Sequence, residues 1–108
     1  MITAKFTCIG GNFKIISIAG HAGCFKNGCD VVCAAVSSAV QMLVNGLNEI
    51  LKLGCKVHKS ESEIILVLGT DNPSYTEAGQ LLLETFRLHM VALAAENEGA
   101  IKVLMLEE

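Results

Sequence analysis

The sequence predicts an α+β fold: a two-layer sandwich of element order ββαββαβ, in which two helices pack on one mixed or antiparallel sheet. Three observations lead to this prediction. Two runs of alternating residues open the chain, two long stretches carry apolar residues at helical spacing, and short apolar runs lie between and after them. The last six elements match the split-βαβ arrangement, so we expect a ferredoxin-like core with an extra N-terminal strand.

The first two elements form a predicted hairpin. Apolar residues alternate with Thr and Lys over residues 2–8, which is the period of a half-buried strand. Gly10-Gly11-Asn12 can supply the positive φ angles of a tight turn. The sequence therefore predicts a turn there and a second strand over residues 13–19.

A helix is predicted next, because apolar residues recur at helical spacing after a glycine-containing segment. Asp30 stands at the expected N-cap, where a carboxylate accepts backbone N–H bonds, and this makes Cys33 the third residue of the first turn. We expect the helix to end near Leu53, with Gly54 as its stop. Small apolar residues on its other side indicate that this helix is covered on more than one side.

Three further strands are predicted from short apolar runs. Residues 55–58 form a short strand, residues 59–62 a polar turn, and residues 64–68 a fully buried strand. A last strand over residues 101–106 closes the chain.

The second helix has two possible starts. Asn72 could cap it with Pro73 at the first helical position, or Ser74 and Glu77 could form a capping box. Its apolar stripe runs to about Ala95.

The composition indicates one compact domain over residues 1–108. Hydrophobic residues make up 52% of the chain and charged residues 18%, which leaves apolar surface that a homo-oligomer would bury. The formal charge of −3 and the lack of a basic cluster argue against a nucleic-acid partner.

No apolar signal segment opens the chain, and polar residues interrupt the uncharged stretch 31–48, so a membrane span is not expected. The odd number of cysteines favours free thiols in a reducing cytoplasm over a framework of disulfides.

The segment from Gly20 to Ser37 holds residues suited to thiol chemistry. His21 follows a predicted strand, while Asp30 and Cys33 open a predicted helix. A thiol becomes a nucleophile near neutral pH when a base takes its proton and a helix N-terminus stabilises the thiolate. Ser37 lies one turn after Cys33 on the same face. The pattern alone leaves two interpretations open: a Cys–His site, or a turn histidine and a buried, inert cysteine.

This segment resembles a known family. Gly20-His21-Ala22-Gly23, the glycine and aspartate of residues 28–30, and the run from Val32 to Ser37 are closely similar to the motifs of the ribosomal-processing cysteine protease Prp family. Residues 77–83 are similar as well. Near the last helix the family often has Tyr-Pro, whereas this chain has Glu96-Asn97-Glu98-Gly99.

The resemblance implies a homodimeric, cytoplasmic cysteine endopeptidase without a cofactor or metal. Its substrate would be a ribosomal protein precursor, large-subunit protein twenty-seven, from which it removes a short apolar N-terminal extension. By motif position, His21 would be the general base and Cys33 the nucleophile. Asp30 and Ser37 would be auxiliary site residues. The loop that meets the substrate would include Gly20, Ala22, Gly23 and Gly28.

Two other functions remain open at this point. A metal site could draw on His21, His58 and four of the cysteines, but the cysteine spacing differs from ferredoxin runs and contains no CxxC pair. A non-catalytic ribosome-assembly module would use a sheet edge or the glycine-containing loop as its docking surface.

Overall fold

The computed structural model describes residues 1–20, 29–69 and 73–108, with residues 29–30 and 73–76 described by their backbone alone. The predicted order ββαββαβ is confirmed. The elements are β1 (Ile2–Ile9), β2 (Asn12–Ala19), α1 (Cys29–Val44) with a π-helical continuation η1 (Asn45–Ile50), β3 (Lys56–Lys59), β4 (Glu63–Val67), α2 (Pro73–Glu96) and β5 (Ile101–Glu107).

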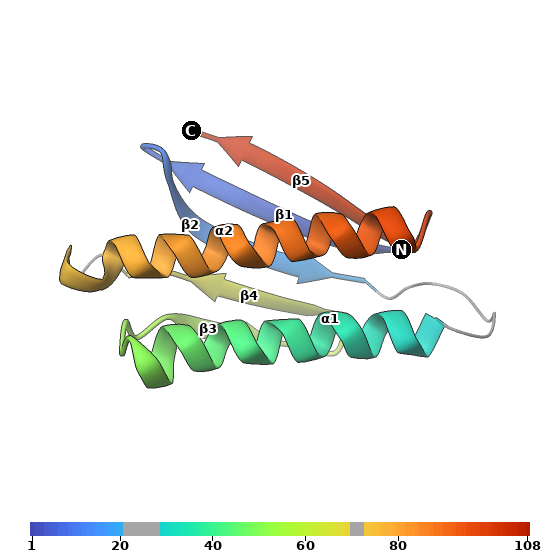
Figure 1. The fold of residues 1–108 in the computed structure, drawn as a ribbon, viewed down its shortest axis with the longest axis horizontal. Helices are drawn as coiled ribbons and strands as arrows, with labels where there is room; N and C mark the ends of the chain where they lie inside the picture. Colours follow the sequence, from blue (N-terminus) through green and yellow to red (C-terminus); the bar gives the residue numbers. More distant parts are fainter. Residues whose placement is uncertain (21–28, 70–72) are drawn as a thin grey trace.

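One five-stranded sheet carries both helices on the same face (Figure 1). Its strand order is β3-β4-β2-β1-β5, with β1 parallel to β5 and every other neighbouring pair antiparallel. Strands β2, β4 and β3 keep the neighbours that a ferredoxin-like core requires. The extra strand β1 lies between β2 and β5, where such a core would pair those two directly. The predicted α+β sandwich is therefore confirmed, with its additional strand at an interior position.

The hairpin between β1 and β2 forms as predicted. Gly10 and Gly11 have φ angles of 62° and 84°, the left-handed values that a two-residue turn of type I′ requires at both positions. Ile9 pairs with Asn12 across this turn. A bulge after Thr7 then shifts the register by one residue.

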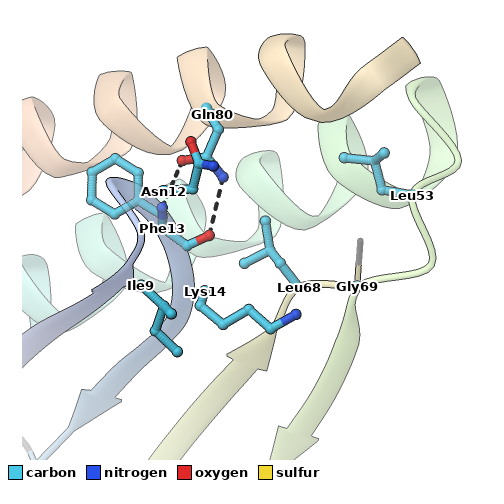
Figure 2. A pocket seen from close by; sticks show the side chains of 8 residues that line it. All are labelled: Ile9, Asn12, Phe13, Lys14, Leu53, Leu68, Gly69 and Gln80. Carbon is cyan, nitrogen blue, oxygen red and sulfur yellow. Dashed lines mark hydrogen bonds between the residues drawn. The ribbon is translucent and has the colours of Figure 1, made fainter. Parts of the chain in front are cut away.

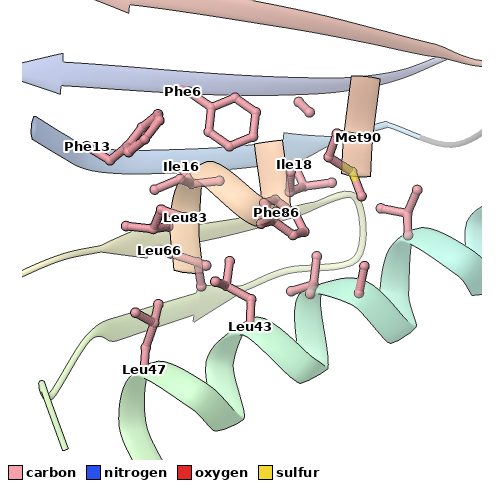
Figure 3. Close-up of a cluster of buried hydrophobic side chains, with 14 of the residues drawn as sticks. Phe6, Phe13, Ile16, Ile18, Leu43, Leu47, Leu66, Leu83, Phe86 and Met90 are labelled. Carbon is pink, nitrogen blue, oxygen red and sulfur yellow. The ribbon is translucent and has the colours of Figure 1, made fainter. Parts of the chain in front are cut away.

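The core lies between the helices and the sheet (Figure 3). Phe6 on β1 meets Phe13 and Phe86 with ring centroids 5.9 Å away in each case. Aliphatic side chains of α1, β2 and β4 fill most of the remaining space, as expected from the small number of aromatic residues. The fully buried large side chains are Phe6, Ile16, Leu47, Leu66, Leu83 and Met90.

Helix α1 differs from the prediction at both ends. It begins at Cys29, so Asp30 lies inside its first turn instead of capping it, and Cys33 is the fifth residue. Regular helix ends at Ile50, after which Lys52 takes a left-handed φ of 53°. Asn48 stabilises this exit, because its side-chain amide donates to the Cys55 carbonyl and accepts from the Cys55 N–H, at 2.9 and 2.7 Å. The helix therefore stops before Leu53.

Helix α2 begins at Pro73, at the first of the two predicted starts. Proline suits a first helical position because its missing N–H would have no partner there. The helix ends at Glu96, close to the predicted end. Strands β3 and β4 each lie within one residue of their predicted bounds.

Candidate active site

Cys33 and Ser37 lie on one face of α1, one helical turn apart. Cys33 is half-buried and packs beside the core, whereas Ser37 is exposed. Helical side chains lean toward the N-terminus, so the thiol is directed over the first turn of α1. Backbone N–H groups in a first turn lack intrahelical partners and favour negative charge.

Both residues line a cavity of about 180 Å³ between α1 and the sheet. Buried aliphatic side chains supply one part of its wall: Ile2, Ile18, Val36 and Val40. A cavity of roughly 150 Å³ with aliphatic walls is large enough to hold a benzene molecule. The thiol therefore stands beside a space that accepts an apolar side chain.

The turn between β3 and β4 forms the opposite wall of this cavity, from Lys59 to Ile64. The Ser60 N–H donates to the Glu63 carbonyl at 2.9 Å and closes the turn. Ser17 on the neighbouring strand β2 donates its hydroxyl to Glu63 at 3.0 Å. Sequence reasoning treated residues 59–62 only as a polar turn and residue 64 as the start of a strand, because their place opposite Cys33 depends on the strand order. These hydrogen bonds help to hold the polar wall in place.

Gly20 lies at the same cavity, immediately after β2. Its φ is +92°, and a Cβ atom there would be 2.4 Å from the Met1 carbonyl oxygen. Its N–H donates to the Ser62 carbonyl at 2.8 Å. The chain can leave β2 in this direction only with glycine at position 20.

The remaining predicted site residues stay untested. His21, Ala22, Gly23 and Gly28 lie outside the described residues, and so does the side chain of Asp30. The structure thus brings together Cys33, Ser37 and Gly20 around one cavity. The pairing of Cys33 with His21 stays a prediction.

Two other cysteines are in a different environment. Cys8 and Cys55 are buried, with 4% and 5% of their surface exposed, and neither forms a disulfide. Burial raises the pKa of both thiols, and the carboxylates of Glu107 and Glu84 raise the pKa of Cys8 further. Both residues therefore stay protonated near neutral pH, as expected of thiols that only pack in the core.

A second cavity, of about 280 Å³, lies at the opposite end of the sheet (Figure 2). Its polar centre is Gln80 on α2. The side-chain oxygen of Gln80 accepts a hydrogen bond from the Phe13 N–H. The side-chain nitrogen of Gln80 donates a hydrogen bond to the Phe13 carbonyl oxygen at 3.0 Å. The Gln80 side chain thus acts as a strand partner for Phe13 beside the bulge. Its hydrogen-bonding groups are occupied by the fold.

Metal ligands do not gather in the part of the chain that the structure describes: no three His, Cys, Asp or Glu side chains there could hold one ion. Cys55 is buried beside Asn48, while His58 is exposed on β3.

A thiol on an early turn of a helix is a usual setting for a reactive cysteine, including the nucleophile of cysteine proteases. The family model described as cysteine protease Prp matches residues 1–102. The chain belongs to this family, as the motif resemblance predicted.

Solved structures of similar fold agree. The SMU.848 protein of Streptococcus mutans superposes with a TM-score of 0.89 at 29% identity, over 100% of this chain and 96% of that one. The essential ribosomal processing protease Prp of S. aureus, in complex with a covalently linked product peptide, gives 0.85 at 21% identity, over 97% and 99%. Its complex with a substrate peptide gives 0.85 at 19% identity over the same shares. No curated protein matches the chain significantly.

Proposed function

We propose that this protein is a cysteine endopeptidase that removes a short apolar N-terminal extension from large-subunit ribosomal protein twenty-seven. Cys33 is the nucleophile and His21 the general base, with Asp30 and Ser37 as auxiliary residues. The observation that carries the proposal is the cavity at which Cys33, Ser37 and Gly20 meet, in a chain whose residues 1–102 match the Prp family. The aliphatic walls of that cavity suit an apolar substrate segment.

The proposed chemistry is acyl transfer through a thioester. His21 takes the thiol proton, and the Cys33 sulfur attacks the scissile carbonyl carbon. N–H groups in the first turn of α1 stabilise the oxyanion as it forms. The imidazolium then protonates the leaving amine, and water hydrolyses the acyl-enzyme to release the extension and restore the thiol.

We also propose that the protein is a cytoplasmic homodimer. Helix α1 and its continuation are long and apolar enough to cross a membrane by composition, yet 33% of an 18-residue window within Val31–Ile50 is buried in the fold. Val32, Val36, Val40 and Leu43 place it in the domain core, while Val31, Met42 and Ile50 stay exposed. A second copy would cover such apolar side chains. The buried thiols Cys8 and Cys55 suit a reducing compartment.

The function is tested with a synthetic peptide that spans the extension and the first mature residues. We expect Cys33→Ala and His21→Ala each to lower kcat/KM by about a thousandfold or more, because nucleophile and base act as one unit. Mass spectrometry of the products measures cleavage. Ser38→Ala is the matched control, since Ser38 is an exposed α1 residue that does not line the cavity. Cleavage by either of the first two variants at the wild-type rate would refute the assignment.

A further inference from the structure

Strand β3 is an edge of the sheet in the part of the chain that the structure describes. It pairs with β4 alone, and all four of its residues, Lys56–Lys59, are exposed. Within the part of the chain that the structure describes, no backbone group bonds to the outer side of β3. Such an edge is a template onto which another extended chain can pair.

The hairpin geometry determines which β3 groups face outward. Ser60 and Glu63 form a hydrogen-bonded pair at the turn. Antiparallel pairs alternate between bonded and non-bonded, so Lys59 and Ile64 form a non-bonded pair. By the same alternation, the N–H and C=O groups of Lys59 and Val57 point away from β4. Two residues on one edge therefore offer donors and acceptors at the spacing that a β-strand needs.

The open edge leads into the Cys33 cavity. Lys59 is the last residue of β3 and also lines that cavity together with Cys33 and Ser37. An extended peptide that pairs with Val57 and Lys59 would run toward the end of the sheet at which the Cys33 cavity lies. Pairing with the edge would set the direction of the peptide, and the aliphatic cavity would take one of its side chains.

We propose that the substrate peptide binds as an added strand on the outer edge of β3, with backbone hydrogen bonds to Val57 and Lys59 that position its scissile bond at Cys33. This inference rests on the peptidase function proposed above, because it assigns the substrate-binding edge of the same site. The β3 edge is then a specificity element that recognises an extended backbone.

The charges on β3 favour a peptide over a second copy of the chain. A pairing of two β3 edges would bring Lys56 and Lys59 of both copies into one short ribbon, and like charges close together across strands are destabilising. Lysine on an edge strand is a common protection against such self-pairing. An uncharged apolar segment meets no repulsion there.

The first experiment measures binding to the Cys33→Ala protein, which would retain the substrate uncut. A fluorescent peptide of the extension and first mature residues is the probe, with each backbone amide N-methylated in turn. We expect Kd to rise about fivefold to tenfold at every second position, because each methyl removes one strand hydrogen bond. Intervening positions should change less than about twofold. A profile without this alternation would overturn the proposal.

The second experiment removes one outward N–H from the protein. Val57→Pro deletes a donor that faces away from β4, a position that tolerates proline on an edge strand. Val57→Ala is the matched control, because it shortens the same side chain and keeps the N–H. We expect Kd for the peptide to rise about fivefold in the proline variant relative to the alanine variant. Equal affinities of the two folded variants would contradict the pairing. Should Val57→Pro not fold, the N-methyl profile alone decides.

Two further measurements separate the edge proposal from the proposed function and from self-association. Cleavage of the peptide by the protein with Cys33 intact tests the peptidase function. A wild-type protein that binds the peptide with alternating sensitivity but never cleaves it would sink the function and keep the edge assignment. Sedimentation of wild type and Val57→Pro tests the rival occupant. Loss of a dimer in the proline variant would show that a second copy covers β3, which overturns the proposal.

Discussion

The two cavities at opposite ends of the sheet differ in what their polar groups do. The larger one, about 280 Å³, centres on Gln80, whose amide is bonded on both sides to the backbone of Phe13 (Figure 2). The smaller one, about 180 Å³, is lined by the Cys33 thiol and the Ser37 hydroxyl, next to a wall of aliphatic side chains. The Gln80 amide completes the hydrogen bonding of the sheet, whereas Cys33 and Ser37 place reactive groups at the wall of a cavity.

This difference teaches that cavity size does not identify the reactive end of the molecule. The Gln80 cavity exists because β2 has a bulge and β4 ends early, so a helix side chain supplies the missing strand contacts. The Cys33 cavity exists because α1 opens over the end of β2 and the β3–β4 turn. The following predictions test this contrast between a structural end and a reactive end.

The largest effect should be in thiol reactivity. We expect iodoacetamide at pH 7 to label Cys33 about 100-fold or more faster than Cys8 and Cys55, which must first be exposed by unfolding. Their raised pKa values add to this protection, since the reactive thiolate forms only at higher pH. Timed labelling with peptide mapping measures each rate, and a denatured sample provides the reference. Equal labelling of all three residues in the folded protein would remove the distinction.

A stability effect should mark the Gln80 end. Gln80→Leu leaves the Phe13 N–H and C=O groups without their partners, so we expect the free energy of unfolding to fall by about 2 kcal/mol. The kcat/KM of the folded protein should stay near wild type. Urea unfolding gives the stability. Gln41→Leu is the control, because Gln41 bonds only to the exposed side chain of Asn45. A Gln80 variant no less stable than the Gln41 variant would show that the strand-like contact contributes little.

The smallest effect should come from Ser37. Removing a hydroxyl at the cavity but outside the nucleophile–base pair should lower kcat/KM by about threefold to tenfold, the size of one ordinary hydrogen bond. Ser38→Ala provides the comparison, since its exposed hydroxyl lies next in sequence but away from the cavity. Steady-state kinetics of the two alanine variants separates them. Indistinguishable values would remove Ser37 from the site.

Much of the fold follows from local patterns in the sequence. The β1–β2 hairpin was predictable because paired glycines in a type I′ turn leave few alternatives. The interior position of β1 was not predictable, because no local pattern says whether an added strand joins an edge or separates two others. The helix end was missed for a similar reason. Asn48 stops α1 through bonds to Cys55, a contact between residues in different elements.

The site was predictable only in part. Cys33 and Ser37 share a helical face by simple periodicity, and the structure keeps them on one cavity. The wall from Lys59 to Ile64 could not be found this way, since it reaches Cys33 only through the pairing of β4 with β2. Gly20 was selected because it belongs to a family motif. The structure explains why a glycine is needed there, since position 20 lies close to the Met1 backbone. Periodicity locates one side of a cavity, and strand order supplies the other.

The parallel pairing of β1 with β5 has a consequence for how the chain matures during synthesis. Ile2 pairs with Ile101, so β1, the first strand to be synthesised, can form backbone hydrogen bonds on its second side only after β5, the last strand, has been made. Until then the nascent hairpin exposes one row of backbone groups, and pairing of such distant segments is slow. A ribosome that stalls before β5 emerges would therefore hold an incomplete sheet that is prone to aggregation. In that sheet β1, which carries Phe6, is already paired with β2, but its other edge has no strand partner.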